Sequence, residues 1–312
     1  MGTPPETVQA SSLGASQENE TESAPWEKTG DEALFRERPV KVIQPPRFSL
    51  RTIFTGLRTL MQYSDLLYTL SLFRLSVRYK QSALGWAWAA VQPLALMGIY
   101  TIIFTRVASI STGGVPYPVF VFSGLLPWIL FSSAISNAVN GLVLYPNLLT
   151  KMYFPREIIP FSYLLAALAD FCIASALLAG LMAYYRLPFS WHLVYAAPIV
   201  ALLAAFAAAI ALFFSALQVR FRDVGLAMPF LLQIWMFTVP VVYSIQSVPA
   251  RFRALYLLDP VAGLIENFRR LIVYRTDPDM GMMLFCAVTT LVGLCLSYAF
   301  FKSSEATMAD NI

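Results

Sequence analysis

The sequence predicts an all-α integral membrane protein with six transmembrane helices, and three observations point to this fold class. The 312 residues are 58% hydrophobic and only 13% charged, whereas a typical soluble domain is about 25% charged. The mean hydropathy is +0.63. Charge-free stretches approach or exceed the roughly 20 residues that a helix needs to cross a bilayer. Because a soluble core could not bury this much apolar surface, an ordinary cytosolic enzyme is excluded.

Six apolar runs predict the six spans. An acidic or basic residue inside a span is rare and functional by default, and Asp170 is the only carboxylate within these runs. We expect Asp170 to make a hydrogen bond between helices, with a role in gating or in a conduit as the alternative. A single carboxylate gives little support to an ion-coupled carrier or a channel. The runs are Gln81–Thr105, about 118–139, Ile158–Tyr185, Leu187–Val219, Val224–Ser244 and Gly281–Phe301.

Charge divides the chain into an acidic tail and a basic membrane domain. Residues 1–32 hold seven acids and one base, a net charge of −6, and residues 33–312 hold 21 bases and 11 acids, a net charge of +10. Residues 1–60 therefore predict a polar, largely disordered tail, and residues 61–312 the transmembrane domain. Nucleic-acid binding is not expected, because the bases flank apolar runs and do not form one stripe.

The positive-inside rule predicts that both termini lie in the cytoplasm. The first two loops of the opposite side contain only Arg106 and Arg186, although the last external loop, 245–280, departs from the pattern with five arginines. Eight bases flank the spans on the side assigned to the cytoplasm: Arg74, Arg78, Lys80, Lys151, Arg156, Arg220, Arg222 and Lys302.

Residues 65–80 predict an amphipathic helix in the membrane interface before the first span. A strand is the alternative, but a lone strand at a membrane would leave its edges unpaired. Arg74, Arg78 and Lys80 could bind the phosphates of a lipid head group, since guanidinium groups bind phosphate bidentately. The simpler alternative is generic attraction to anionic lipid, worth about 1 kcal/mol per base. The apolar face consists of Leu66, Leu70, Phe73 and Val77.

The last external loop predicts a short amphipathic helix that re-enters the outer face of the membrane, between spans five and six. Asp259 can cap its N-terminus and Pro260 suits its first position. Glu266 precedes Arg269 and Arg270 by three and four residues, where ion pairs can form. The apolar face would consist of Val261, Leu264, Ile265, Phe268 and Ile272.

The first cytoplasmic loop, NLLTKMYFPREIIP at 147–160, combines apolar anchors with a charged rim. This is the composition of a docking element for a partner protein, and an elbow resting on lipid is the alternative. Pro155 and Pro160 would stiffen the loop, so that it transmits force. The predicted docking residues are Lys151, Met152, Tyr153, Phe154, Pro155, Arg156 and Glu157.

No catalytic or metal motif occurs in the sequence. G-x-x-x-x-G-K-[ST], H-E-x-x-H, C-x-x-C and G-x-S-x-G are all missing, so we expect no phosphate-binding loop, resident cofactor or metal site in this chain. The rival class is an integral-membrane glycosyltransferase or polymerase. Such an enzyme would need carboxylates at the membrane edge, where only Glu157 and Asp223 qualify.

Several segments, in order, carry a family resemblance. From about Leu66 to its C-terminus the chain resembles the membrane subunit, or permease, of ABC-type polysaccharide exporters, which serve O-antigen, capsule and teichoic acid export. The tail before about residue 60 departs from the compact family pattern, so nothing about its role carries over. The matching segments are VRYKQSALGWAWAAVQPL (77–94), LLTKMYFPREIIP (148–160), VRFRDVG (219–225) followed by Pro229, PVVY (240–243), and LLDP (257–260) with Glu266 and Arg269.

The resemblance implies a homodimer in the bacterial cytoplasmic (inner) membrane, bound to two copies of a separate ATPase subunit. That partner would bind ATP and Mg and move the spans through the docking loop. The second cytoplasmic loop contributes Arg220, Arg222 and Asp223 to the same face. Asp259, Glu266 and Arg269 would belong to the external helix that the family places between spans five and six.

A lipid-linked polysaccharide would pass through a conduit between the two permease subunits, in contact with membrane lipids. Sugar rings stack their C–H faces on aromatic side chains, although most aromatics near the spans should be interfacial anchors or packing. The conduit candidates are Trp86, Trp88, Phe104, Trp128, Phe131, Asp170, Trp235 and Tyr243.

Overall fold

Long apolar runs form long helices, and the computed structural model of the chain contains only helices and connections among the residues it describes. These belong to residues 45–312, one of two units into which the chain divides. The predicted tail lies outside the described residues up to residue 57. Described are residues 58, 60–80, 82–106, 114–145, 154–245, 248–249, 251–252, 256 and 258–311.

Five helical stretches within the described residues are long and apolar enough to cross a bilayer, which confirms the fold class. A short 3₁₀ turn extends two of the five at the N-terminal end: η1 (Gly85–Ala87) before α3 and η2 (Trp191–Tyr195) before α7. The helices are α3 (Trp88–Arg106), α4 (Tyr117–Leu144), α6 (Ile158–Tyr184), α7 (Ala196–Arg220) and α11 (Met280–Asn311).

The run predicted as the fifth span forms the shorter helix α8 (Asp223–Thr238). Its 16 residues extend about 24 Å at 1.5 Å per residue, less than the roughly 30 Å of a hydrocarbon core. The helix ends because Val239 is extended and Pro240 follows it, and proline disfavours a helical conformation in the residue before it. The count of six spans therefore stays a prediction.

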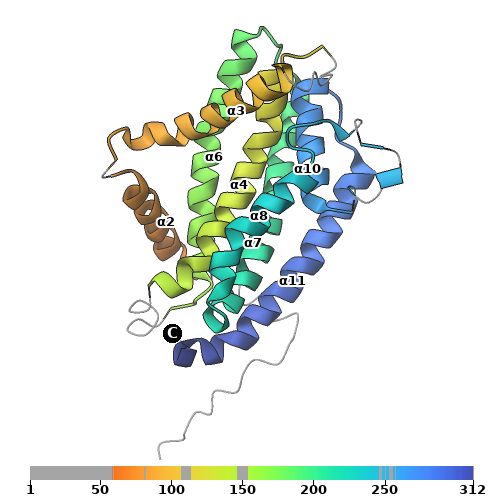
Figure 1. The fold of residues 1–312 in the computed structure, drawn as a ribbon. Helices are drawn as coiled ribbons and strands as arrows, with labels where there is room; N and C mark the ends of the chain where they lie inside the picture. The colour runs from red at the N-terminus through yellow and green to blue at the C-terminus, as the bar shows by residue number, and fades with distance from the viewer. Residues whose placement is uncertain are drawn as a thin grey trace, which may run out of the picture. The chain divides into compact units, whose positions relative to one another are not determined.

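The helix predicted before the first span is present as α2 (Ser64–Tyr79), so the strand alternative is wrong. α2 runs along the first half of α6, because Arg74 lies over the ring of Tyr163 and Tyr79 bonds Asp170 two turns further on. α3 then crosses α4 and α6 at a steep angle (Figure 1). The position of α2 relative to the membrane interface stays a prediction.

α4 is the central helix of this unit. In the most apolar 18-residue stretch of α4, 78% of the residues are buried, whereas 6% are buried in the corresponding stretch of α3. α4 packs on α3, α6, α7, α8 and α10. Its buried side includes Phe120, Phe122 and Phe131. Both α3 and α8 expose several of their large apolar side chains, so their outer faces are available to lipid or to another subunit.

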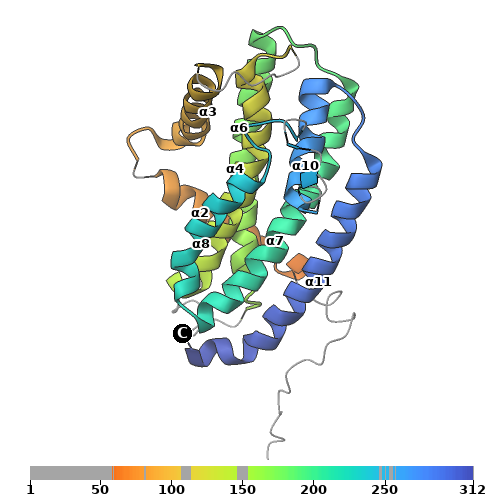
Figure 2. The same cartoon turned by 45° about the vertical axis from the view of Figure 1, so that its right-hand side comes forward.

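The predicted external helix is α10 (Pro260–Arg269), followed by a π-helical turn, η4 (Arg270–Tyr274). Asp259 caps it by accepting a hydrogen bond from the backbone N–H of Val261, as predicted. The expected apolar face is buried against α4, α7 and α11 (Figure 2). Its re-entry into the membrane stays a prediction.

Candidate functional site

The elbow before α6 carries the end of the predicted docking loop. Lys151, Met152 and Tyr153 lie outside the described residues. Phe154, Pro155 and Arg156 are half-buried, and Glu157 is fully buried next to the first turn of α6. The described part of the elbow, 154–157, is therefore packed against the rest of the chain.

A cluster of charged residues, which we call the elbow clamp, joins this elbow to the C-terminal part of α11. Lys302 Nζ lies 2.8 Å from Glu157 Oε2, and the Tyr298 hydroxyl donates to Glu157 Oε1 at 3.2 Å. Lys302 also pairs with Glu305 at 2.9 Å. Arg156 Nη1 donates to the backbone oxygen of Glu305 at 2.6 Å. The clamp satisfies a carboxylate that would otherwise be buried at high cost.

The side chain of Glu157 is fully buried and paired with Lys302 within the chain, which weighs against a place for Glu157 in a cleft of the ATPase; docking through this elbow stays a prediction. The same burial weighs against Glu157 as a carboxylate of a glycosyltransferase site. The sequence offered a weak signal for the clamp: Tyr298, Lys302 and Glu305 recur at helical spacing across the end of the last apolar run. Nothing in the sequence indicated that their partner lies more than 140 residues away.

The loop predicted to be the second cytoplasmic one is a two-residue connection between α7 and α8, and Arg220, Arg222 and Asp223 are exposed there, as expected for a surface loop. Gln218 holds this connection: its side-chain oxygen accepts from the backbone N–H of Gly225, and its amide donates to Asn140 on α4 at 3.4 Å. A Cβ on Gly225 would overlap Asn140 and Gln218. Alanine at this place in VRFRDVG would therefore force the side chains of Asn140 and Gln218 to move.

Comparison with known proteins identifies this architecture. The family model described as ABC-2 type transporter matches residues 65–273. The chain belongs to the ABC-2 type transporter family. It is 31% identical to the O-antigen export system permease protein RfbA of Myxococcus xanthus, over 82% of this chain and 98% of that protein.

Two further relatives of this ABC-2 transporter also align over most of their length. The O-antigen export system permease protein RfbA of Klebsiella pneumoniae is 29% identical, over 74% of this chain and 90% of that protein. The polysialic acid transport protein KpsM of Escherichia coli is 24% identical, over 78% of this chain and 94% of that protein. The resemblance found in the sequence is thereby confirmed at the level of the family.

The predicted head-group residues of this ABC-2 transporter do not share one environment. Arg74 is buried, with its guanidinium stacked over the rings of Tyr145 and Tyr163 at 4.2 and 4.3 Å. The prediction that Arg74 projects toward lipid is wrong, because these cation–π contacts turn it into the protein. Arg78 is ion-paired with Asp170, and Lys80 is exposed. The head-group role of these last two stays a prediction.

Arg78 and Asp170 lie in a pocket of about 490 Å³ between the α2–α3 connection and helices α4 and α6, which we call the lateral pocket. Tyr79 donates to Asp170 Oδ1 at 2.9 Å. The predicted hydrogen bond between helices through Asp170 is thereby confirmed. The polar groups that line the pocket are Arg78, Tyr79, Ser82, Gln92, Ser133, Asn137 and Asp170.

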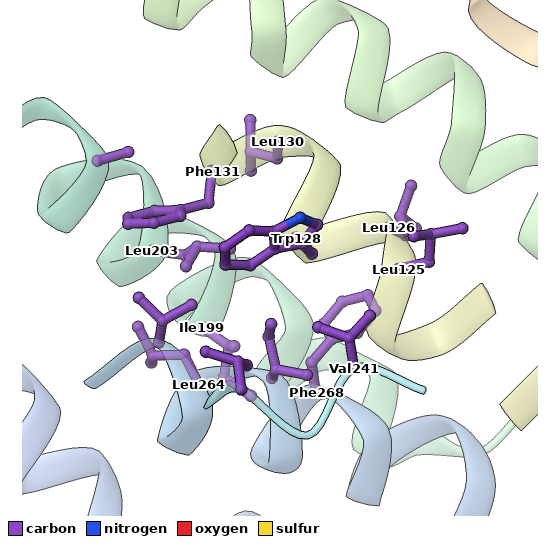
Figure 3. Packing of buried hydrophobic residues seen from close by; sticks show 14 of the residues in the cluster. Leu125, Leu126, Trp128, Leu130, Phe131, Ile199, Leu203, Val241, Leu264 and Phe268 are labelled. Atoms are coloured by element: carbon purple, nitrogen blue, oxygen red, sulfur yellow. The ribbon is translucent and has the colours of Figure 1, made fainter. Parts of the chain in front are cut away.

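The conduit candidates separate by burial. Trp128 and Phe131 are buried in the core, as Figure 3 shows among Leu125, Leu203 and Phe268, which weighs against a place for these two in the wall of a conduit. Phe131 packs edge-on against Trp235 with ring centres 5.1 Å apart. Trp86 and Trp88 are exposed, and Trp88 lines the lateral pocket. For the others, Phe104, Asp170, Trp235 and Tyr243, which are half-buried, a conduit role stays a prediction.

At the end opposite to the elbow, Arg269 is fully buried. The predicted pair with Glu266 is present at 3.2 Å, but no sequence pattern indicated that both residues are buried. Arg269 also donates to the backbone oxygens of Pro240, Val241 and Tyr243, at 2.8, 2.7 and 3.3 Å. We call Arg269, Glu266 and the carbonyls of 240–243 the outer anchor. It ties α10 to the segment that follows α8.

Asp259 makes a second link near the outer anchor. The indole N–H of Trp235 donates to Asp259 Oδ2 at 2.6 Å, across from the helix cap. Burial raises the pKa of the Asp259 carboxyl above its ordinary value, and the hydrogen bonds from Trp235 and from the backbone oppose the rise.

Among the described residues, no group of three His, Cys, Asp or Glu side chains could hold a metal ion.

Proposed function

We propose that this chain is the permease subunit of an ATP-driven exporter, which moves a lipid-linked polysaccharide across the bacterial cytoplasmic membrane. The observation that carries the proposal is the alignment with 98% of the Myxococcus xanthus O-antigen export permease. Since the sequence contains no phosphate-binding loop, ATP and Mg belong to a separate ATPase subunit. Two copies of this chain and two of the ATPase would form the exporter, with the conduit between the two permeases.

The orientation follows from the bases at the elbow end. The start of α6, the connection between α7 and α8, and the C-terminal part of α11 meet at this end of the chain. They carry four bases: Arg156, Arg220, Arg222 and Lys302. Positive charge near span ends favours the cytoplasmic side. The elbow then faces the cytoplasm, where an ATPase can dock, and both termini lie on that side.

The elbow clamp supports a coupling role for this region. Glu157 and Arg156 connect the start of α6 to the C-terminal part of α11. A push on the loop at 147–156 would therefore move two helices together, not α6 alone. The exposed arginines of the second loop, Arg220 and Arg222, add a charged surface beside it.

Docking is tested by changing Tyr153 and Phe154 together to Ala in cells that depend on this exporter. We expect surface glycan and co-purification of the ATPase to fall several-fold, because apolar anchors dominate such contacts. The matched control changes Tyr184 and Phe189 to Ala, two residues of the same types that are exposed at the opposite end. Normal export and a normal complex in the docking variant would overturn the coupling role.

A further inference from the structure

The lateral pocket is lined by residues of a single chain. The end of α2, the start of α3 and the inner faces of α4 and α6 enclose it. Its volume of about 490 Å³ falls in the range of about 300–1,000 Å³ typical of small-molecule sites. The side chains of Arg78, Trp88 and Gln92 are all substantially exposed, so the pocket opens to the surface.

The charge of the pocket is balanced. Arg78 is the only basic residue among its described lining residues, and Asp170 the only acidic one, and the two are paired. Tyr79 satisfies the second oxygen of Asp170. An anionic ligand would have to break this pair and then face the carboxylate. The electrostatics therefore favour a neutral ligand over a phosphate.

The pocket also offers hydrogen-bonding groups that the protein does not use. Ser82 Oγ is buried without a hydrogen-bond partner among the described residues. Gln92 lines the opening, and Asn137 donates its amide to Ser133 O at 2.7 Å, which leaves its side-chain oxygen as an acceptor. Unsatisfied polar groups disfavour an acyl chain in this space. A ligand that brings several hydroxyls could bind the side chains of Gln92 and Asn137.

Aromatic rings supply the remaining wall. Tyr79, Trp88 and Phe171 line the pocket from three different helices. A pocket that combines aromatic faces, a paired guanidinium and carboxylate, and neutral amides matches a ring with apolar C–H faces and equatorial hydroxyls.

We propose that the lateral pocket binds a neutral sugar residue. The inference rests on the proposed function for the source of that sugar, which is the exported glycan. Gln92 and Asn137 would bind its hydroxyls and Trp88 would stack on its ring, while Arg78 and Asp170 stay paired. Such a site would let each permease recognise one sugar of the glycan, in addition to the conduit between subunits.

The test uses the full-length chain with its ATPase partner in nanodiscs of uncharged phosphatidylcholine. The probe is glycan released by mild acid from the bacterium that carries this chain, separated into neutral and anionic fractions. The difference in tryptophan fluorescence between the native chain and the Trp88→Phe variant isolates the signal of Trp88 and so reports ligand binding in the pocket. We expect the neutral fraction to give a saturable change, and Gln92→Leu and Asn137→Leu to weaken it about tenfold each. Gln233→Leu, an exposed glutamine on α8, is the matched control and should bind normally.

Three results would overturn the sugar site. One is a saturable change given by pyrophosphate or by phosphatidylglycerol but not by the neutral fraction. Another is the absence of any change with the neutral fraction, and the third is equal binding by the pocket variants and the control. Export assays separate this failure from that of the proposed function. A chain that exports glycan but binds no neutral sugar loses only the pocket, and a chain that binds sugar but exports no glycan loses only the exporter role.

Discussion

The elbow clamp and the outer anchor both bury a charge, but they satisfy it in different ways. Arg269 is fully buried and donates mainly to backbone carbonyls, which cannot move unless the chain after α8 moves with them. Glu157 is bound by the side chains of Lys302 and Tyr298, and Lys302 remains 17% exposed. An arginine fork fixes geometry more strictly than a lysine on a flexible stem. The comparison indicates a rigid outer end and an elbow end that can rearrange.

Removal of Arg269 should have the largest effect. Arg269→Met leaves Glu266 buried without its cation and three carbonyls without a donor, and we expect a loss of about 5 kcal/mol in the free energy of unfolding. Chemical unfolding in detergent micelles measures it. Arg270→Met, at the neighbouring half-buried arginine, is the control. Equal stability of the two variants would contradict the anchor.

Removal of the cation from the elbow clamp should cost less stability than removal of Arg269. Lys302→Met leaves the Glu157 carboxylate with only Tyr298, and we expect a loss of about 3 kcal/mol. Adding Glu157→Gln removes the unpaired charge while Tyr298 can still donate, so the double variant should regain most of the loss. If the clamp also transmits motion, the stable double variant exports less glycan than the native chain. Normal export by that variant would mean that the clamp stabilises the fold but does not transmit motion.

A close contact at the outer anchor gives a smaller, steric test. A Cβ on Gly124 would overlap a nitrogen of Arg269 and the carbonyl of Val241, whereas Gly180 has open space at the same place. Gly124→Ala should therefore cost about 1–3 kcal/mol through overpacking. Gly180→Ala, near the C-terminal end of α6, should be neutral or stabilising, since alanine favours helix. Unfolding curves for the two variants in one detergent decide between these outcomes.

The sequence predicted the elements of this fold well because their causes are local. Charge-free runs predicted the spanning helices within a few residues, and Asp259 with Pro260 predicted the start of α10. The end of α8 was placed too late, at Ser244. The carbonyls of Pro240, Val241 and Tyr243 accept hydrogen bonds from Arg269, more than 20 residues further on, so the departure of this segment from the helix depends on a tertiary contact.

The site was predicted only in part, for the same reason. Local composition marked the elbow as unusual, but it assigned Glu157 to a partner protein because the ion-pair partner, Lys302, lies 145 residues further along the chain. Arg74 and Trp128 carry the residue types of a binding site and are used for packing. The lateral pocket combines residues from α2, α3, α4 and α6, and no spacing within one segment could predict it.

The smallest effect should come from a single hydroxyl at the outer anchor. Tyr117 on α4 donates to the carbonyl of Val242 at 2.9 Å, beside the carbonyls that Arg269 binds. Tyr117→Phe keeps the ring and removes one neutral hydrogen bond, so the unfolding free energy should fall by about 1 kcal/mol. Tyr68→Phe, at an exposed tyrosine of α2, should change nothing measurable. If Tyr117→Phe lowered the unfolding free energy much more than Gly124→Ala does, Tyr117 and not the guanidinium of Arg269 would hold the segment after α8. The contrast between the outer anchor and the elbow clamp, which is argued from Arg269, would then be wrong.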